Sequence, residues 1–449
     1  MASMEAPAER PQAQAQNGGL RAWYMIAVLL LFYIFSSIDR SVISMMVQPL
    51  ERDLGVSDFQ ISLLQGPAFG VFYVLCGLPM GWLVDRISRR WLVAAGVTVW
   101  GAATCACGLA GNVAQLFAGR MGVGVGESVL TPAAHSMIAE RFPRSRLSFA
   151  ISVFTMGSVV GAGLALTVGG TVVHLVTHGP PLVLPVLGEL KAWQAVFLLV
   201  GAPPVILAPL IFTVREHRRR ATPQALAAAR PKGEALAFYK RRWPIAIGLP
   251  LAFGCTNVAS NVMIAWGPTY LIRTFGWNAA EVGLRYGLVV VVAGAIGQLS
   301  GGAIVDWMYA RGIKDAHVRF HILGLLVSAP ALAFGLLSAN IVFFFIGMTI
   351  FYTASYPYIG YAAAGLQLFT PNSLRGLASA VFLAIITLVG TGLGPTSVAL
   401  VTEQVFHDKA KLGVSMAICI LTAAVVAIAA MLQVGRVMRA ADHDEGAAH

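Results

Sequence analysis

Twelve long apolar segments dominate this 449-residue chain and constrain its fold more than any other feature. Each segment is long enough to cross a hydrocarbon core of about 30 Å as a helix. Charged residues make up only 11% of the chain, against about 25% in soluble domains, so we predict an all-α membrane protein without a large catalytic domain and not an enzyme. The segments are 22–46, 58–84, 91–110, 113–139, 147–175, 193–213, 244–271, 282–308, 319–338, 341–368, 374–402 and 412–436.

The distribution of basic residues predicts the orientation of these helices. If the N-terminus is cytoplasmic, 23 of the 31 Lys and Arg residues fall on the cytoplasmic side, 6 fall on the other side, and Arg40 and Arg120 lie within spans. Because cytoplasmic loops carry an excess of basic residues, both termini are expected in the cytoplasm. The net charge of +11 is then an orientation signal, which argues against nucleic-acid binding. We expect a multi-pass protein of the plasma membrane, which is the cell inner membrane in a bacterium.

A polar connection and a weak internal repeat divide the chain in two. The connection 214–243 carries nine basic residues and separates six predicted helices from six. The sequence GWLVDR at 81–86 is echoed by GAIVDW at 302–307, and FPRSR at 142–146 by FTPNSLR at 369–375. Such echoes indicate a duplicated six-helix unit, so we predict two pseudo-symmetric six-helix bundles. The expected parts are a disordered cytoplasmic tail over 1–21, bundles over 22–213 and 244–438, a cytoplasmic linker over 214–243, and a second tail over 439–449.

No motif for a cofactor or a metal is found. The five cysteines lie in apolar runs without the paired spacing of a metal or redox site. The glycine-rich stretches at 122–126 and 390–395 lie within apolar spans, where small residues allow close helix contact, and no Gly-Lys pair occurs. We therefore expect no cofactor and exclude a P-loop ATPase.

The turn after the second predicted helix concentrates glycine and charge. It contains Gly81, Asp85, Arg86, Arg89 and Arg90, and its echo contains Asp306. Such residues can form a latch between helix ends that breaks when the protein changes state. The alternative is plain positive-inside charge with a solvated aspartate.

This turn, its echo and the duplicated twelve-helix plan resemble the major facilitator superfamily. Within it, SIDR at 37–40, LQG at 64–66 and GRMGVGVGES at 119–128 are similar to spinster-type transporters and their bacterial relatives. On the fifth helix, Gly161, Gly169 and Gly170 fit the superfamily's antiporter motif, but Ala165 and Leu166 stand where Gly-Pro is expected. This departure weakens a prediction of antiport.

Four ionisable residues lie deep within predicted spans: Asp39, Arg40, Arg120 and Glu127. Each costs about 2.5–3.5 kcal/mol if it faces lipid, so they are expected to face a cavity or one another. Asp39 and Arg120 should lie at similar depth, with Glu127 on nearly the same helix face about 10 Å nearer the cytoplasm. We therefore expect Arg120 to lie between two carboxylates. Asp39 and Arg40 point about 100° apart, so only one of them is expected to face the same cavity.

The spinster resemblance implies a functional role for the acids on the first and fourth helices, Asp39 and Glu127. Moving Arg120 from one carboxylate to the other would change which of them holds a proton, and this is a mechanism for proton coupling. The alternative is a permanent ion network that only fixes helix packing.

Two polar pairs are candidates for a substrate cavity. Asn257 and Asn261 are four residues apart on the seventh predicted helix, and Tyr352 and Tyr356 are four apart on the tenth. Each pair shares a helix face and offers hydrogen bonds and aromatic walls to an amphipathic ligand. Interhelical hydrogen bonding and aromatic packing explain these pairs equally well.

These observations together predict a monomeric, proton-coupled secondary transporter that works by alternating access in the lipid bilayer. The spinster resemblance implies an amphipathic or lipid-like substrate. The alternatives are a proton symporter of a small organic acid and a membrane receptor without transport.

Overall fold

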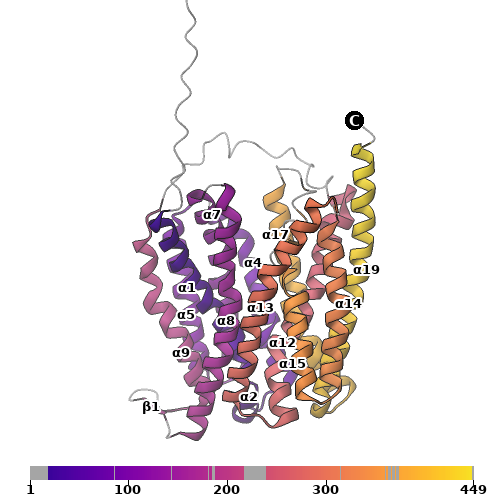
Figure 1. Cartoon of the computed structure of the whole chain (residues 1–449). Coiled ribbons are helices and arrows are strands. Elements are labelled where there is room, and N and C mark those ends of the chain that lie inside the picture. Colours follow the sequence, from indigo (N-terminus) through magenta and orange to yellow (C-terminus); the bar gives the residue numbers. More distant parts are fainter. Residues whose placement is uncertain are drawn as a thin grey trace, which may run out of the picture.

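The chain forms two helical bundles that stand side by side (Figure 1). The computed structural model describes residues 19–446 except 85, 143, 180–181, 185–187, 217–238, 314, 359–360, 363–365, 367–369 and 371–373. We call the described helices before residue 217 the N-terminal bundle and those after residue 238 the C-terminal bundle.

The N-terminal bundle runs in order through α1 (Leu20–Val42), the 3-10 helix η1 (Ile43–Met45), α2 (Val47–Leu54), α3 (Asp58–Gln65), α4 (Pro67–Val84), α5 (Arg89–Gly108), α6 (Val113–Glu127), α7 (Leu130–Arg141), α8 (Arg144–His178), α9 (Ala192–Leu207) and η2 (Ala208–Thr213). Strands β1 (Leu182–Leu184) and β2 (Gly188–Leu190) form a small antiparallel hairpin between α8 and α9.

The C-terminal bundle contains η3 (Pro244–Gly248), α12 (Leu249–Phe275), α13 (Ala279–Ala310), α14 (Ala316–Leu337), α15 (Ile341–Ala354), α17 (Arg375–Ile386), η4 (Thr387–Leu393), α18 (Gly394–Leu400), η5 (Val401–Val405), η6 (Lys409–Lys411) and α19 (Leu412–Gly446). Of these, η3, η4 and η5 are π-helical.

The two ends of the molecule need names before the site is described. In Figure 1, the C-terminal end of α19 lies at one end of the bundles, and α2 and β1 lie at the other. We call the first end the tail face and the second the hairpin face.

Ten stretches of described helix have the length and apolar composition of membrane spans. The fourth and the tenth of the twelve expected spans are not among these ten stretches. The fourth is divided at Ser128 and Val129, between α6 and α7, and the tenth contains α15, whose described helix has only 14 residues.

The second expected span is interrupted at Gly66. Pro67, which follows it, lacks a backbone N–H, so the hydrogen-bonding pattern of α3 cannot continue unchanged into α4. A Cβ atom on Gly66 would come within 2.5 Å of the carbonyl oxygen of Thr391, so only glycine permits this approach of the two bundles. The interruption therefore brings the backbone of the N-terminal bundle against the π-helical segment η4.

The bundles share a core in the hairpin half of the molecule and have separate cores in the tail half. One cluster of buried apolar side chains joins residues such as Val42 and Leu50 to Trp266 and Tyr286 of the other bundle. Nearer the tail face, one cluster lies within the N-terminal bundle and another within the C-terminal bundle. Helices α8 and α13 also meet closely, since a Cβ atom on Gly170 would lie 2.2 Å from the carbonyl oxygen of Ala279. The structure is therefore closed toward the hairpin face.

Candidate functional site

The four deep ionisable residues form two ion pairs between α1 and α6. Arg120 Nη1 lies 3.0 Å from Asp39 Oδ1, and Arg40 Nε lies 3.3 Å from Glu127 Oε2. We expected Arg120 to lie between both carboxylates, and expected only one of Asp39 and Arg40 to face this region. The structure differs on both points, because the long side chain of Arg40 reaches Glu127. Long side chains on a helix lean toward its N-terminus, and for α1 that direction leads toward the tail face, where Glu127 lies relative to Arg120.

The Asp39–Arg120 pair is sealed from solvent, with both side chains no more than 2% exposed. The hydroxyl of Thr104, on α5, donates a hydrogen bond to Asp39 Oδ2. Helices α1, α5 and α6 therefore meet at this carboxylate. Arg120 also donates from Nε to the carbonyl oxygen of Leu64, at 3.3 Å, just before the interruption at Gly66. Its Nη2 is buried and has no hydrogen-bond partner among the described residues. The pair is thus linked to the segment where the two bundles touch.

The Glu127–Arg40 pair is more open. The side chain of Arg40 is 28% exposed, whereas that of Glu127 is fully buried. Ser36 donates a hydrogen bond to Glu127 Oε2 at 2.7 Å, while the buried Oε1 has no partner among the described residues. The guanidinium of Arg40 lies 5.7 Å from the ring centre of Tyr33 and 5.8 Å from that of Phe69. A cation framed by aromatic rings therefore borders the open side of this pair.

Phe69 stands between the two pairs, because the guanidinium of Arg120 is also 5.7 Å from its ring centre. Sequence reasoning did not identify Ser36, Phe69 or Thr104. A hydroxyl or a phenylalanine within a span is common, and only the contacts reveal which ones touch the ion pairs.

The predicted cavity residues lie in the C-terminal bundle as two separate pairs. Asn257 donates to the carbonyl oxygen of Ile386 at 3.1 Å, and Asn261 donates to the carbonyl and side-chain oxygens of Asn257. Tyr352 and Tyr356 are both buried, with ring centres 5.2 Å apart. Tyr356 is close enough to Arg40 to interact electrostatically across the bundle interface. The tyrosine pair therefore lies nearer the open ion pair through Tyr356, while the asparagine amides are used within their own bundle.

The structure describes all of the predicted latch residues except one. Asp85 lies outside the described residues, Gly81 lies near the end of α4, and Arg86 and Asp306 are exposed. Arg89 pairs with Glu140 at 2.6 Å, and Arg90 lies 3.4 Å from Glu216.

Glu216 also binds the N-terminal end of α5. Its carboxylate accepts hydrogen bonds from the Ser88 hydroxyl at 2.5 Å and from the Arg89 backbone N–H at 2.8 Å. Burial raises the pKa of Glu216, but these hydrogen bonds and Arg90 outweigh it and hold that pKa below its ordinary value. Sequence reasoning recognised the arginines but missed both acids, which carry no local motif.

A second ionic cluster, also missed from the sequence, joins the two bundles at the hairpin face. Arg273 of α12 makes a two-pronged contact with Asp58 at 2.7 and 2.8 Å and a 2.9 Å contact with Glu51. Lys409 lies 2.6 Å from the same Glu51 oxygen. Glu403 accepts hydrogen bonds from the backbone N–H groups of Asp58, at 2.7 Å, and Phe59, so it caps α3 from the opposite bundle. We call these five charged residues (Glu51, Asp58, Arg273, Glu403 and Lys409) the hairpin-face network.

Comparison with known proteins decides the family. The model of the Major Facilitator Superfamily matches residues 29–395. The chain belongs to this superfamily. It is therefore a membrane transporter rather than an enzyme, and its relatives include spinster proteins.

Two relatives and one solved structure show what this transporter is similar to. An MFS-type efflux pump of Mycolicibacterium smegmatis is 26% identical over 93% of this transporter and 92% of its own length. Protein spinster of Drosophila melanogaster is 26% identical over 72% of this transporter and 52% of its own length. Among solved structures, a bacterial homolog of the human lysosomal transporter spinster, in an inward-facing and unoccupied conformation, superposes with a TM-score of 0.77. It is 24% identical and covers 94% of this transporter and 98% of its own chain, so this likeness supports the fold alone.

Proposed function

We propose that the transporter is driven by protons and moves an amphipathic, lipid-like substrate by alternating access. The observation that carries this proposal is the presence of two ion pairs between α1 and α6, deep within a membrane fold. One pair is buried from solvent and the other is partly exposed. Ionisable residues within spans are costly and usually functional. We further propose that the transporter is a monomer whose bundles cover 22–213 and 244–438, joined by the linker 214–243.

The proposed orientation places the tail face in the cytoplasm and both termini with it, in the plasma membrane or the inner membrane of a bacterium. The excess of basic residues on this side supports the orientation. The shared core and the hairpin-face network then close the outer side, and the separate cores lie toward the cytoplasm. In this proposal the structure represents the outward-closed state of the cycle.

Proton coupling in this proposal proceeds through Glu127 first. A proton that binds its unpaired Oε1 neutralises the carboxylate and removes its attraction for Arg40. Arg40, which is partly exposed beside Tyr33 and Phe69, is then free to move away from Glu127. Asp39 holds Arg120 and Thr104 in place and is the second carrier, exposed only when α1 and α6 rearrange.

The substrate proposal rests on the same open pair. The guanidinium of Arg40 is partly exposed and lies beside the aromatic rings of Tyr33 and Phe69. Such a cation suits an anionic head group attached to an apolar body. The relatives named spinster agree with the resemblance from which this substrate class is expected.

A small organic acid is the second candidate, because the same cation would bind a free carboxylate. Relatives named as a probable L-galactonate transporter, in Escherichia coli, and a probable galactarate/D-glucarate transporter, in Bacillus subtilis, favour it.

The test is a flux assay with the purified protein in liposomes, with and without an imposed pH gradient. Lysophospholipids and hexuronates serve as the two substrate panels. We expect gradient-dependent flux of the lipid-like panel, which Asp39→Asn and Glu127→Gln uncouple from the gradient. The matched control is Glu189→Gln, an exposed acid of the β1–β2 hairpin. Flux of hexuronates alone would establish the second candidate, and flux that ignores the gradient would contradict proton coupling.

A further inference from the structure

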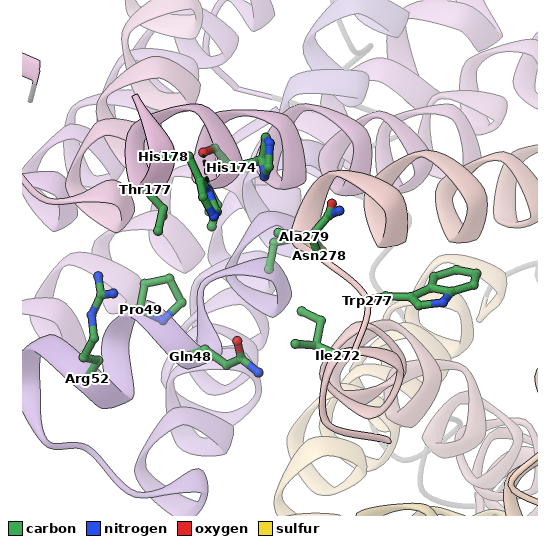
Figure 2. Close-up of a pocket in the computed structure, with 12 residues that line it drawn as sticks. Gln48, Pro49, Arg52, His174, Thr177, His178, Ile272, Trp277, Asn278 and Ala279 are labelled. Carbon is green, nitrogen blue, oxygen red and sulfur yellow. Dashed lines mark hydrogen bonds between the residues drawn. The ribbon is translucent and has the colours of Figure 1, made fainter. Parts of the chain in front are cut away.

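A cavity of about 370 Å³ opens at the hairpin face, separate from the two α1–α6 ion pairs. Figure 2 shows that three segments surround it. Gln48 and Arg52 come from α2, and His174 and His178 from the end of α8. The junction of α12 and α13 contributes Ile272, Trp277, Asn278 and Ala279. We call it the hairpin-face pocket.

Both bundles form the walls of this pocket. Arg52 follows Glu51 in the sequence, and Ile272 precedes Arg273. Two pocket residues are therefore sequence neighbours of two residues of the hairpin-face network. When the bundles separate at this face, the walls contributed by α2 and α8 move away from the wall contributed by α12 and α13. The pocket therefore exists only while the hairpin face is closed.

The polar lining of the pocket is rich in donors and contains no carboxylate among the described residues. Arg52 lies at the rim with its side chain 65% exposed, and its ion pair with Asp53 uses only Nε. The buried Nδ1 of His174 has no hydrogen-bond partner among the described residues. Asn278 accepts the Glu281 backbone N–H through Oδ1, which leaves its amide hydrogens for a ligand. This lining suits an anion held at the Arg52 guanidinium.

The remaining lining is apolar. A small charged ligand would leave this apolar surface in contact with water. The side chains that form it are those of Met45, Pro49, Val173, Ile272 and Trp277. His178 is turned back onto its own helix, because its Nδ1 donates to the carbonyl oxygen of His174 at 3.0 Å. A ligand with an apolar ring beside its anionic group fits both parts of the lining.

We infer that the hairpin-face pocket binds an organic anion with an apolar ring, and that this ligand holds the transporter closed at the hairpin face. A ligand that binds one state and loses its site in the other shifts the population toward the first. The pocket is thus an inhibitory site, distinct from the α1–α6 ion pairs where we propose that the substrate binds, and the inference does not depend on the identity of the substrate.

The test measures binding of radiolabelled naphthoate to the full-length transporter in nanodiscs, with the neutral isostere naphthamide as the matched ligand. We expect naphthamide to bind at least about tenfold more weakly, since a charged hydrogen bond contributes about 1.5–3 kcal/mol. Arg52→Gln should weaken naphthoate binding by a similar factor, and Arg52→Lys should restore part of it. The control Lys411→Gln removes an exposed cation of the same face outside the pocket and should change binding less than twofold.

A further variant tests whether binding requires the closed hairpin face. Arg273→Gln should also weaken naphthoate binding, although Arg273 does not line the pocket, because it opens the face. Equal binding of naphthoate and naphthamide would overturn the inference. So would binding that survives Arg52→Gln but is lost in Arg40→Gln, since the anion would then bind at the α1–α6 ion pairs.

Discussion

The α1–α6 ion pairs join helices of one bundle, whereas the hairpin-face network joins one bundle to the other. Both use arginines and carboxylates at similar distances. In the first set only Arg40 is appreciably exposed, at 28%, whereas Lys409 in the second is 52% exposed. In the proposed cycle, rocking of the bundles would break the second set and leave the first intact. We propose from this difference that the network sets which state is populated and that the α1–α6 pairs respond to protons.

The largest expected effect comes from removing Arg120, which strands Asp39 in a sealed site. Breaking a buried pair by removing one partner costs about 3–5 kcal/mol. We expect Arg120→Gln to lower the melting temperature of the detergent-solubilised protein sharply, and Asp39→Asn/Arg120→Gln to recover much of the loss. A double variant no more stable than Arg120→Gln would show that the two residues do not act as a pair.

Arg273→Gln should have the next largest effect, and on the population of states rather than on stability. It removes the two-pronged contact with Asp58 and the contact with Glu51. Spin-label distances between Ala114 and Val342 should lengthen as the hairpin face opens, and Lys411→Gln should leave them unchanged. An unaltered distance distribution in Arg273→Gln would mean that apolar packing alone closes this face.

Glu51 is expected to add a smaller pH dependence to the network. Burial and the neighbouring Asp58 carboxylate raise its pKa in the closed structure. Opening returns Glu51 to water and to its ordinary pKa, so the closed state binds the proton more tightly and acid favours closure. The closed population should therefore rise as pH falls through the raised pKa toward the ordinary one.

Glu51→Gln checks this sign. The variant should lose that part of the pH dependence in the Ala114–Val342 distances while keeping any part due to Asp39 and Glu127. A closed population that falls on acidification in the wild type but not in Glu51→Gln would reverse the assignment.

The smallest effect is expected at Glu216, which acts within the N-terminal bundle only. Its lowered pKa means that its contribution to stability is fully present above the ordinary pKa of a glutamate and is lost as pH falls through the lowered value. Glu216→Gln should lower the melting temperature slightly at pH 7 and make no difference at strongly acidic pH. A variant that behaves like the wild type at pH 7 would show that the contacts of Glu216 with Ser88 and Arg89 contribute little.

The fold was largely predictable from the sequence, because hydropathy and membrane thickness together determine where helices can lie. Interruptions were harder to predict. Gly66 and Pro67 are plain in the sequence, but only the approach of Thr391 shows why the helix is interrupted there. Likewise, α6 ends at Glu127 inside an apolar run that had predicted one continuous helix.

The sequence predicted which ionisable residues form the site, but not which of them form ion pairs with each other. Burial cost identified Asp39, Arg40, Arg120 and Glu127 as a group. The helical angle between neighbours misled the assignment of partners, since it ignores the reach of an arginine side chain. The hairpin-face network was missed because Glu51, Arg273 and Lys409 are far apart in sequence and look like ordinary loop charges.

Proton coupling through the buried pairs is tested most directly by distance measurement at the tail face as a function of pH. Spin labels at Ala139 of α7 and Ala310 of α13, in a background without the five native cysteines, report the separation of the two bundles. We predict that the wild type shifts between two distance populations with pH, and that Asp39→Asn and Glu127→Gln each lose part of this shift while remaining folded. An unaltered pH midpoint in both variants would contradict the proposal and place the proton carriers elsewhere in the protein.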